Sequence, residues 1–276
     1  MGDLLLDTTV EPQGDGLFRA AIARDWQTFG PNGGYLAALA LRAVGRFTCM
    51  RRPVSVAGHF LRIGRPGPVD ITVVRLRSGR QAECLRATVR QRGAPIFEAT
   101  VWAVASELNG PRRQWTAPPE VPGPEGLPTV NERLAADGVP ALSVADTCID
   151  SRPAEWAAGG RGRAEGEPVL RGWIRFRDRP SFAEDVWLDF GRAAFVVDIE
   201  QFAAASLGLP AAEVTFFAPT LDLYVAFHEP APRDEWLLVE ARGLAAADGL
   251  IGGTARVWTL DRRLVASGSS QMLCRL

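Results

Sequence analysis

The C-terminal part of the chain alternates between apolar and polar residues in a way that is typical of a β-hairpin. Residues 252–260 (GGTARVWTL) predict one strand, and after a turn-like LDRR residues 265–274 (VASGSSQMLC) predict its partner. Because successive side chains of a strand point to opposite faces, Ser267, Ser269 and Gln271 share one face of this partner strand. Two interpretations stay open: that face is solvated, or Gln271 has a role inside the protein.

Two long segments are apolar on nearly every face when they are placed on a helix. They are residues 33–47 (GGYLAALALRAVGRF) and residues 193–208 (AAFVVDIEQFAAASLG). A helix that is apolar all round must be surrounded by the rest of the protein, and a curved antiparallel sheet can surround it. The pattern therefore predicts two long helices, each wrapped by strands.

The segments around these helices occur twice, in the same order. WQTFG at 26–30 matches WLDFG at 187–191, RPGPVD at 65–70 matches EPAPRD at 229–234, and residues 88–104 parallel residues 256–272. The offsets are 161, 164 and about 168 residues, so the register drifts only slightly. We infer two copies of one unit, which consists of a strand, an apolar helix and several strands joined by tight turns. This is the hotdog architecture, and two copies predict a double hotdog of the α+β class.

The two copies predict a division of the chain into three parts. We expect an N-terminal hotdog at residues 1–107 and a C-terminal hotdog at residues 169–276 that carries the catalytic residues. Residues 108–168 are rich in proline, glycine and charge, which excludes a strand core. They predict a linker that follows the surface, with one short helix at residues 129–138.

Composition limits the classes of function. The chain has 276 residues, 47% of them hydrophobic, and a formal net charge of −1, which gives no general electrostatic basis for binding nucleic acid or an anionic membrane. All 31 basic residues are arginine, so lysine-based chemistry is excluded. Four widely spaced cysteines without a CxxC motif favour reduced, buried thiols in a cytoplasmic protein. Neither a signal peptide nor a membrane-spanning segment is expected.

Several catalytic motifs are missing from the sequence. There is no GxSxG, no P-loop, no HExxH and no GxGxxG between a predicted strand and helix. Only two histidines, His59 and His228, are present, which limits both histidine catalysis and metal binding. We therefore expect no metal and no redox cofactor.

Most of both halves resembles the acyl-CoA thioesterase II (TesB-type) family, a group of double-hotdog proteins. The matching segments are GPNGGYLAALALRA (30–43), HFLRIGRPGP (59–68), LRATVRQRGAPIFEATVWA (85–103), DLYVAFHEP (222–230) and GGTARVWTLDRRLVASGSSQ (252–271). The resemblance implies hydrolysis of acyl-CoA to a free fatty acid and coenzyme A. It also implies a homodimer or a higher homo-oligomer, and coenzyme A as part of the substrate rather than as a cofactor.

The family positions the attacking water with an aspartate, a threonine or serine, and a glutamine. By motif position the resemblance assigns these roles to Asp198, Thr220 and Gln271. Taken alone, a carboxylate in the apolar helix around Asp198 indicates either a base whose pKa is raised by burial, or a helix face that reaches solvent or a partner arginine. Thr220 is equally typical of a strand start, and Gln271 of a solvated strand.

The repeat allows an internal comparison of the three residues. The offsets place Asp198 opposite Ala37, and Thr220 and Gln271 opposite Val56 and Ala103, which are all apolar. Residues that served only the fold would be expected in both copies. Their absence from the first copy predicts one working site per chain.

The resemblance also indicates residues that bind the substrate. Arg77 and Arg80 lie in an arginine cluster with Arg62 and Arg65. The cluster would receive the phosphates of coenzyme A, since guanidinium groups bind phosphate with two hydrogen bonds. An apolar tunnel for the acyl chain is predicted to be lined by Phe195, Phe202 and Trp258. Core packing for the aromatic residues and solvated strand edges for the arginines are the alternatives.

Two other functions stay open. One is a protein that binds acyl-CoA or another lipid without turnover. The other is an enoyl-thioester hydratase or dehydratase of the hotdog type, which needs a closely spaced aspartate and histidine. Asp222 and His228 are six residues apart on a predicted strand, a spacing that does not bring their side chains together.

Overall fold

The structure is a computed structural model that describes residues 1–276 except 106–107, 157–166, 178, 180, 211–212 and 276. Its helices are α1 (Leu4–Asp7), the 3₁₀ turn η1 (Arg24–Trp26), α2 (Gly33–Phe47), α3 (Val130–Ala136), α4 (Ser143–Thr147), α5 (Val186–Ile199) and α6 (Gln201–Ser206). Its strands are β1 (Glu11–Gly14), β2 (Leu17–Ile22), β3 (Arg52–Phe60), β4 (Gly67–Arg77), β5 (Ala82–Gln91), β6 (Ala94–Val104), β7 (Ile149–Pro153), β8 (Val169–Phe176), β9 (Thr220–Phe227), β10 (Leu237–Ala247), β11 (Leu250–Thr259) and β12 (Leu264–Leu273).

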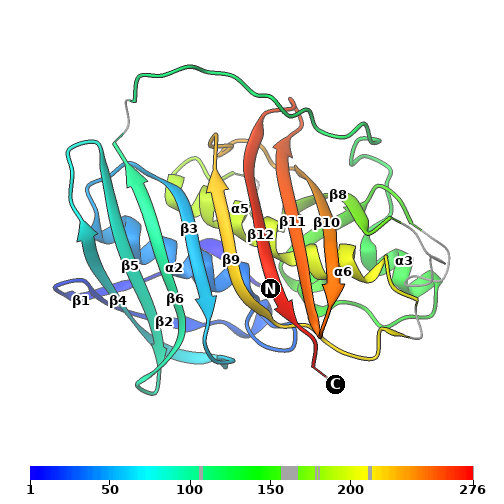
Figure 1. The fold of residues 1–276 in the computed structure, drawn as a ribbon, viewed down its shortest axis with the longest axis horizontal. Coiled ribbons are helices and arrows are strands. Elements are labelled where there is room, and N and C mark those ends of the chain that lie inside the picture. Colours follow the sequence, from blue (N-terminus) through cyan, green and yellow to red (C-terminus); the bar gives the residue numbers. More distant parts are fainter. Residues whose placement is uncertain (106–107, 157–166, 178, 180, 211–212, 276) are drawn as a thin grey trace.

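All these strands form one antiparallel sheet. Its order is β1-β2-β4-β5-β6-β3-β9-β12-β11-β10-β8-β7 (Figure 1). Read inward from each edge, the two halves have the same order of elements, so that β7 corresponds to β1 and β9 to β3. The halves meet where β3 pairs with β9, from Ser55 opposite Ala226 to His59 opposite Asp222. The predicted double hotdog is confirmed.

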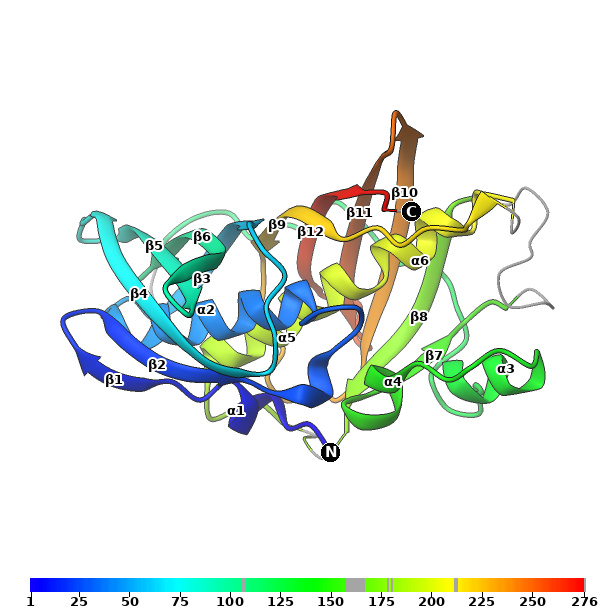
Figure 2. The same cartoon turned by 90° about the horizontal axis from the view of Figure 1, so that it is seen from below.

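The sheet curves around α2 and α5, which lie side by side on its inner face (Figure 2). The helices run antiparallel and approach closely through glycines. A Cβ atom on Gly34 would overlap the backbone of Phe195, and one on Gly191 would lie 3.0 Å from the Cβ of Ala38. At the other end of the crossing, a Cβ on Gly45 would lie 2.5 Å from the indole of Trp187. The C-terminal end of α5 is therefore held against the N-terminal end of α2.

The predicted pairing of the helices was wrong by several residues. WLDFG lies inside α5, whereas WQTFG precedes α2, so these two segments are not equivalent. Counted from the first residue of each helix (186 to 198 and 33 to 45), Asp198 corresponds to Gly45 rather than to Ala37. The second half also has an insertion after α5, which contains α6 and the loop before β9. Because of this insertion, the starts of the corresponding elements differ by 153 residues at the helices (186 − 33) and by 168 at β3 and β9 (220 − 52).

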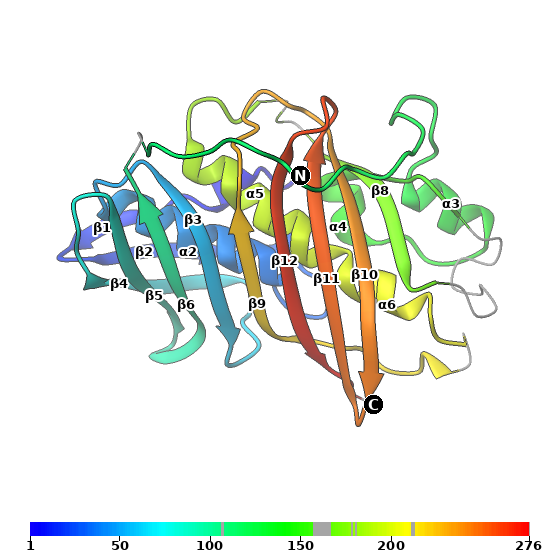
Figure 3. The same ribbon diagram turned by 45° about the horizontal axis from the view of Figure 1, so that its top comes forward.

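The first part of the segment predicted as a linker covers the outer face of the second half, whereas its later part supplies the edge strand β7, so the exclusion of a strand core was wrong there. The segment contains α3, which confirms the predicted short helix and begins with a capping box between Thr129 and Glu132. It also contains α4 and β7, while residues 157–166 of it lie outside the described residues. Figure 3 shows its first part crossing the ends of β12 and β11. There the indole of Trp173 donates to the carbonyl of Pro122 at 2.8 Å. The boundaries of the three parts stay a prediction.

The cysteines and helices bear on two further expectations. All four cysteines are free, and Cys84 and Cys148 are buried, but Cys49 is exposed. Among the described residues, none of the helices has the length and apolarity that crossing a membrane would need.

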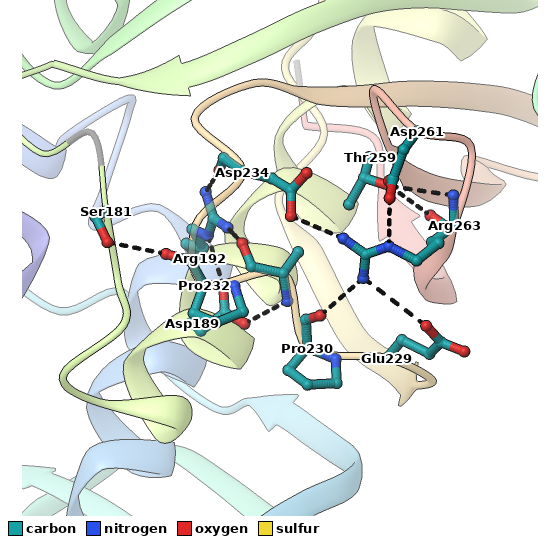
Figure 4. Close-up of polar contacts among 11 residues, drawn as sticks. Ser181, Asp189, Arg192, Glu229, Pro230, Pro232, Asp234, Thr259, Asp261 and Arg263 are labelled. Atoms are coloured by element: carbon teal, nitrogen blue, oxygen red, sulfur yellow. Dashed lines mark hydrogen bonds and ion pairs between the residues drawn. The ribbon is translucent and has the colours of Figure 1, made fainter.

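A fully buried ion pair ties α5 to the loop between β9 and β10 (Figure 4). The guanidinium of Arg192 donates to Asp189 at 2.8 Å, and both side chains have no exposed surface. Arg192 also donates to the carbonyls of Asp234 and Ala231, and the amide of Ala231 donates back to Asp189 at 2.7 Å. Arg263 holds the same loop from β12 through Asp234 at 2.9 Å. The repeated Pro-rich segment at residues 229–234 is thus held in place by the buried Asp189–Arg192 ion pair.

We expect Arg192→Leu to lower the free energy of unfolding by about 3–5 kcal/mol, because it leaves the Asp189 carboxylate buried without its partner. Urea unfolding monitored by circular dichroism measures the change. As a control, Glu120→Gln removes the exposed ion pair with Arg262. This control should cost less than about 1 kcal/mol. Equal losses in the two variants would contradict the structural role of the buried pair.

Candidate active site

A pocket of about 790 Å³ lies between the two halves of the molecule. The first half contributes the loop before α2 and the end of β3 with the loop that follows it. The second half contributes the end of α5, α6, the start of β9, the end of β12, and residues of α3, α4, β7 and β8. This volume is in the range of pockets that enclose a small-molecule ligand.

Asp198 lies in the last turn of α5 and lines this pocket. Its Oδ2 accepts hydrogen bonds from Nδ2 of Asn32 at 3.1 Å and from the backbone amide of Gly34 at 3.0 Å. Both donors belong to the start of α2, where Asn32 is also the N-cap residue and accepts from the amide of Tyr35 at 3.0 Å. A carboxylate is favoured at this position, because the N-terminus of a helix carries a partial positive charge and free N–H groups.

Two opposing effects act on the pKa of Asp198. Burial disfavours the charged form and raises the pKa, whereas the hydrogen bonds from Gly34, Thr220 and Asn32 lower it. Burial is the larger effect, and the pKa of Asp198 is raised to about 6. A carboxyl group with this pKa is ionised at neutral pH and is a stronger base than an exposed aspartate. The expectation of a carboxylate enclosed by protein, with its pKa raised by burial, agrees with this geometry.

Thr220 reaches Asp198 because of a bulge at the start of β9. Gln271 pairs with Asp222 and Met272 pairs with Thr220, so Leu221 is an extra residue without a partner. A bulge of this kind redirects the side chains on one side of it. The hydroxyl of Thr220 therefore faces the helix side and lies 3.5 Å from Oδ1 of Asp198.

The prediction that Gln271 belongs to this site was wrong. Gln271 is exposed and does not line the pocket, whereas its neighbours Ser270 and Met272 are buried. Strand alternation thus places Gln271 on the outer face, where its backbone amide donates to Asp222 at 3.2 Å. The face that holds Gln271 is solvated, as the first interpretation of its alternating pattern states.

The inward residue beside Gln271 is Ser270, which takes part in a closed buried network. Its hydroxyl donates to Oε1 of Gln201 at 2.8 Å, and Nε2 of Gln201 donates to the carbonyl of Val197 at 2.8 Å. Neither Ser270 nor Gln201 lines the pocket. The network therefore joins α5, α6 and β12 beneath the site without entering it.

Of the three aromatic residues predicted to line the tunnel, Phe202 lines the pocket from α6, and the other two lie elsewhere. Phe195 packs between the helices, against Gly34 and with its ring 5.4 Å from that of Trp26. Trp258 lies on the outer face of the sheet, beneath the linker and beside Trp173. Both are core residues, so their assignment to substrate binding was wrong. Core packing, the alternative left open for them, is what the structure shows.

Arg77 and Arg80 lie at the wrong end of the sheet for this pocket. Arg77 pairs with Cys84 near the end of β4, whereas the pocket adjoins the opposite ends of the strands, at Phe60 of β3. Arg77 instead lies over the ring of Trp102 at 5.8 Å. Three other arginines, Arg62, Arg171 and Arg275, line the pocket. The predicted arginine cluster thus contained one pocket residue, Arg62, but not the two that were chosen from it.

Sequence reasoning missed three residues of the pocket: Asn32, Glu200 and Arg275. The segment GPNGGY (30–35) forms the start of α2, which binds an anion, the carboxylate of Asp198. Its source could not be read from the sequence, because it depends on how α2 and α5 cross. Glu200 gave no signal, since it occupies a position between two helices that was predicted as one.

The site shows little that favours a metal or a hydratase. Among the described residues, no group of three or more His, Cys, Asp or Glu side chains could hold a metal ion. Asp222 and His228 do not line the pocket, and His228 lies 2.9 Å from the hydroxyl of Ser267 on the outer face. The residues that a hotdog hydratase would need are therefore outside this pocket.

Comparison with known families gives two adjacent matches. Residues 22–104 match the model of the acyl-CoA thioesterase N-terminal domain, and residues 112–273 match that of the acyl-CoA thioesterase C-terminal domain. A comparison with curated proteins finds no match.

Solved structures share the fold over nearly the whole chain. The acyl-CoA thioesterase II TesB2 from Mycobacterium marinum is 22% identical, with a TM-score of 0.78 over 99% of this chain and 98% of its own. The tesB protein from Mycobacterium avium subs paratuberculosis is 23% identical, with a TM-score of 0.78 and the same coverage. A conserved protein of unknown function with a hot dog fold from Alicyclobacillus acidocaldarius is 19% identical, with a TM-score of 0.80 over 99% and 98% of the two chains.

We expect Asn32→Leu to raise the pKa of Asp198 above its value of about 6, because the charged form loses a donor. Asn32→Asp is the matched variant. It keeps an oxygen that can cap α2 but places a second carboxylate beside Asp198, so it should raise the pKa further. Carboxyl ¹³C titration by NMR measures the shift. An unchanged pKa in both variants would show that this contact does not hold the charge of Asp198.

Proposed function

The chain belongs to the acyl-CoA thioesterase family, and from this premise we propose that it cleaves acyl-CoA by direct attack of a water molecule held by Asp198 and Thr220. It is a thioester hydrolase, and the products would be a free carboxylic acid and coenzyme A. The observation that carries the proposal is the carboxylate of Asp198, which lines the pocket and has its pKa raised by burial.

The two oxygens of Asp198 have different surroundings, which suits a general base. Oδ2 is held by Asn32 and Gly34, so the carboxylate is fixed in one orientation. Oδ1 has the hydroxyl of Thr220 near it, at 3.5 Å. A water molecule bound between Oδ1 and this hydroxyl would lose its proton to Asp198 as it attacks the thioester carbonyl carbon. The C–S bond then breaks, and the proton passes to the departing thiolate.

The start of α2 is the best-placed group to stabilise the oxyanion. Gly33 lies against the carboxylate of Asp198, with its added Cβ position 3.0 Å from Oδ2. The amides of Gly34 and Tyr35 already donate to Asp198 and Asn32, so what the start of α2 offers to an oxyanion is the positive end of its helix dipole. Arg62 and Arg275, which line the pocket, are suited to the phosphates of coenzyme A.

We expect Asp198→Asn to lower kcat by at least about a hundredfold, because it removes the base while keeping its shape. Thr220→Ala should cost about tenfold through loss of a hydrogen bond to the water. Gln271→Ala is the matched control, and it should retain activity within about twofold because its side chain is on the outer face. Thiol release from a panel of short to long acyl-CoAs measures these rates.

Two outcomes of this assay would overturn the proposal. Wild-type protein that binds acyl-CoA but releases no thiol would favour the binding protein over the enzyme. Loss of the crotonyl-CoA double bond without thiol release would favour a hydratase. A large loss of activity in Gln271→Ala would contradict the structural placement of that residue.

The pH dependence should follow the ionisation of Asp198. We expect kcat/KM to rise with pH through an apparent pKa of about 6 and then to level off, since the protonated carboxyl cannot accept a proton. Because the folded-state pKa lies above the unfolded value, this group stabilises the fold at low pH and loses that contribution as pH rises through about 6. Asp198→Asn should therefore gain in stability relative to wild type between pH 4 and pH 7. Paired rate and urea-unfolding measurements test both signs.

A further inference from the structure

A second carboxylate lines the pocket and has no part in the proposed hydrolysis. Glu200 is the residue that separates α5 from α6, with φ −100° and ψ −4°. It follows Asp198 by two residues, with Ile199 between them also lining the pocket. Side chains two residues apart diverge by about 200° around a helix. The two carboxylates therefore serve different regions of one pocket.

The surroundings of Glu200 are largely apolar. Its hydrogen-bond partner is Ser151 of β7, whose hydroxyl donates to Oε1 at 3.4 Å. The neighbouring walls from α3, α4, β7 and β8 include Leu134, Val144, Ile149 and Val169. Burial raises the pKa of Glu200 to about 7, so both protonation states are populated near neutral pH.

No cation in the described part of the chain neutralises Glu200. Arg171 also lines the pocket, but its guanidinium is bound to Glu240 at 2.8 Å and to Glu155 at 3.1 Å. Among the residues that the structure describes, the carboxyl of Glu200 is thus left with one long hydrogen bond, from the hydroxyl of Ser151. A carboxyl group in such a place has unused capacity to donate or accept hydrogen bonds.

A plain alkyl chain is a poor neighbour for this carboxyl. An alkyl group packed over Glu200 would exclude water and offer no hydrogen bond, which costs free energy for a buried polar group. A hydroxyl on the chain can donate to the ionised carboxylate or accept from the protonated acid. An ammonium group, by contrast, could pair only with the ionised form.

We propose that Glu200 and Ser151 form a polar subsite that selects acyl chains bearing a hydroxyl group several carbons away from the thioester. Asp198 is directed at the start of α2, where the carbonyl would react, and Glu200 is directed at β7, along the acyl chain. A site that hydrogen-bonds a substrate hydroxyl rejects the analogue that lacks it. This proposal rests on the proposed thioesterase function.

The test compares thiol release from decanoyl-CoA with release from decanoyl-CoA hydroxylated at carbon 3, carbon 6 or carbon 10. For wild type we expect kcat/KM to be at least about tenfold higher for the carbon-6 or carbon-10 form than for the plain chain. Glu200→Leu should bring this ratio close to one by raising activity on the plain chain and lowering it on the hydroxylated chain. Ser151→Ala should lower the ratio in part. Glu235→Leu, at a carboxylate that is bound to Arg175 outside the pocket, is the matched control and should leave the ratio unchanged.

Each other outcome has a distinct meaning. Equal rates for plain and hydroxylated chains in wild type would overturn the subsite while leaving the hydrolase intact. Loss of activity on both chains in Glu200→Leu would show a role in the reaction or the fold instead of in selection. A preference confined to carbon 3, or a preference for an amino group in place of the hydroxyl, would also overturn the proposal.

Binding separates this proposal from failure of the proposed function. If no acyl-CoA is hydrolysed, the dissociation constants of the plain and hydroxylated decanoyl-CoAs can be measured by calorimetry with Asp198→Asn. A tenfold tighter binding of the hydroxylated chain that disappears with Glu200→Leu would support the subsite without catalysis. Equal binding would overturn it.

Discussion

The close antiparallel crossing of α2 and α5 is the constraint on which the rest of the structure depends. Gly34 and Gly191 let the two backbones approach closely, and Gly45 leaves room for the indole of Trp187. Because the helices are antiparallel, the end of one lies at the start of the other. This places the carboxylate of Asp198 on the first N–H groups of α2. A larger residue at any of these glycines would move the base relative to its partners before it changed the chemistry directly.

The site is a compromise between burial and hydrogen bonding. Enclosure by both halves makes the charge of Asp198 costly, and the donors at the start of α2 limit that cost without cancelling it. Since Asn32 and Gly34 come from the first half and Thr220 from the second, neither half holds the complete arrangement. The sequence predicted all catalytic residues in the second half. The first half also contributes, because it supplies the groups that orient the base.

Local patterns in the sequence predicted the fold well and the site only in part. The order of strands and the two apolar helices follow from periodicity and turns, which are local. The start of α5 was misplaced because WLDFG is compatible both with a segment before a helix and with its first turns. Thr220 depends on a bulge at Leu221 that no local pattern predicts. Gln271 could have been excluded, since its neighbour Met272 is apolar and strand alternation puts the two on opposite faces. The cytoplasmic location and the homo-oligomeric state stay predictions.

The pairing of β3 with β9 makes the two halves parts of one continuous sheet. In an assembly of two separate chains, an equivalent junction would come apart on dilution, and a pocket shared between the chains would be lost with it. Here the connection is covalent, so each half meets the other at a fixed effective concentration whatever the amount of protein in solution. The arrangement around Asp198 therefore forms within a single chain, and the fraction of protein that has it should not depend on the protein concentration.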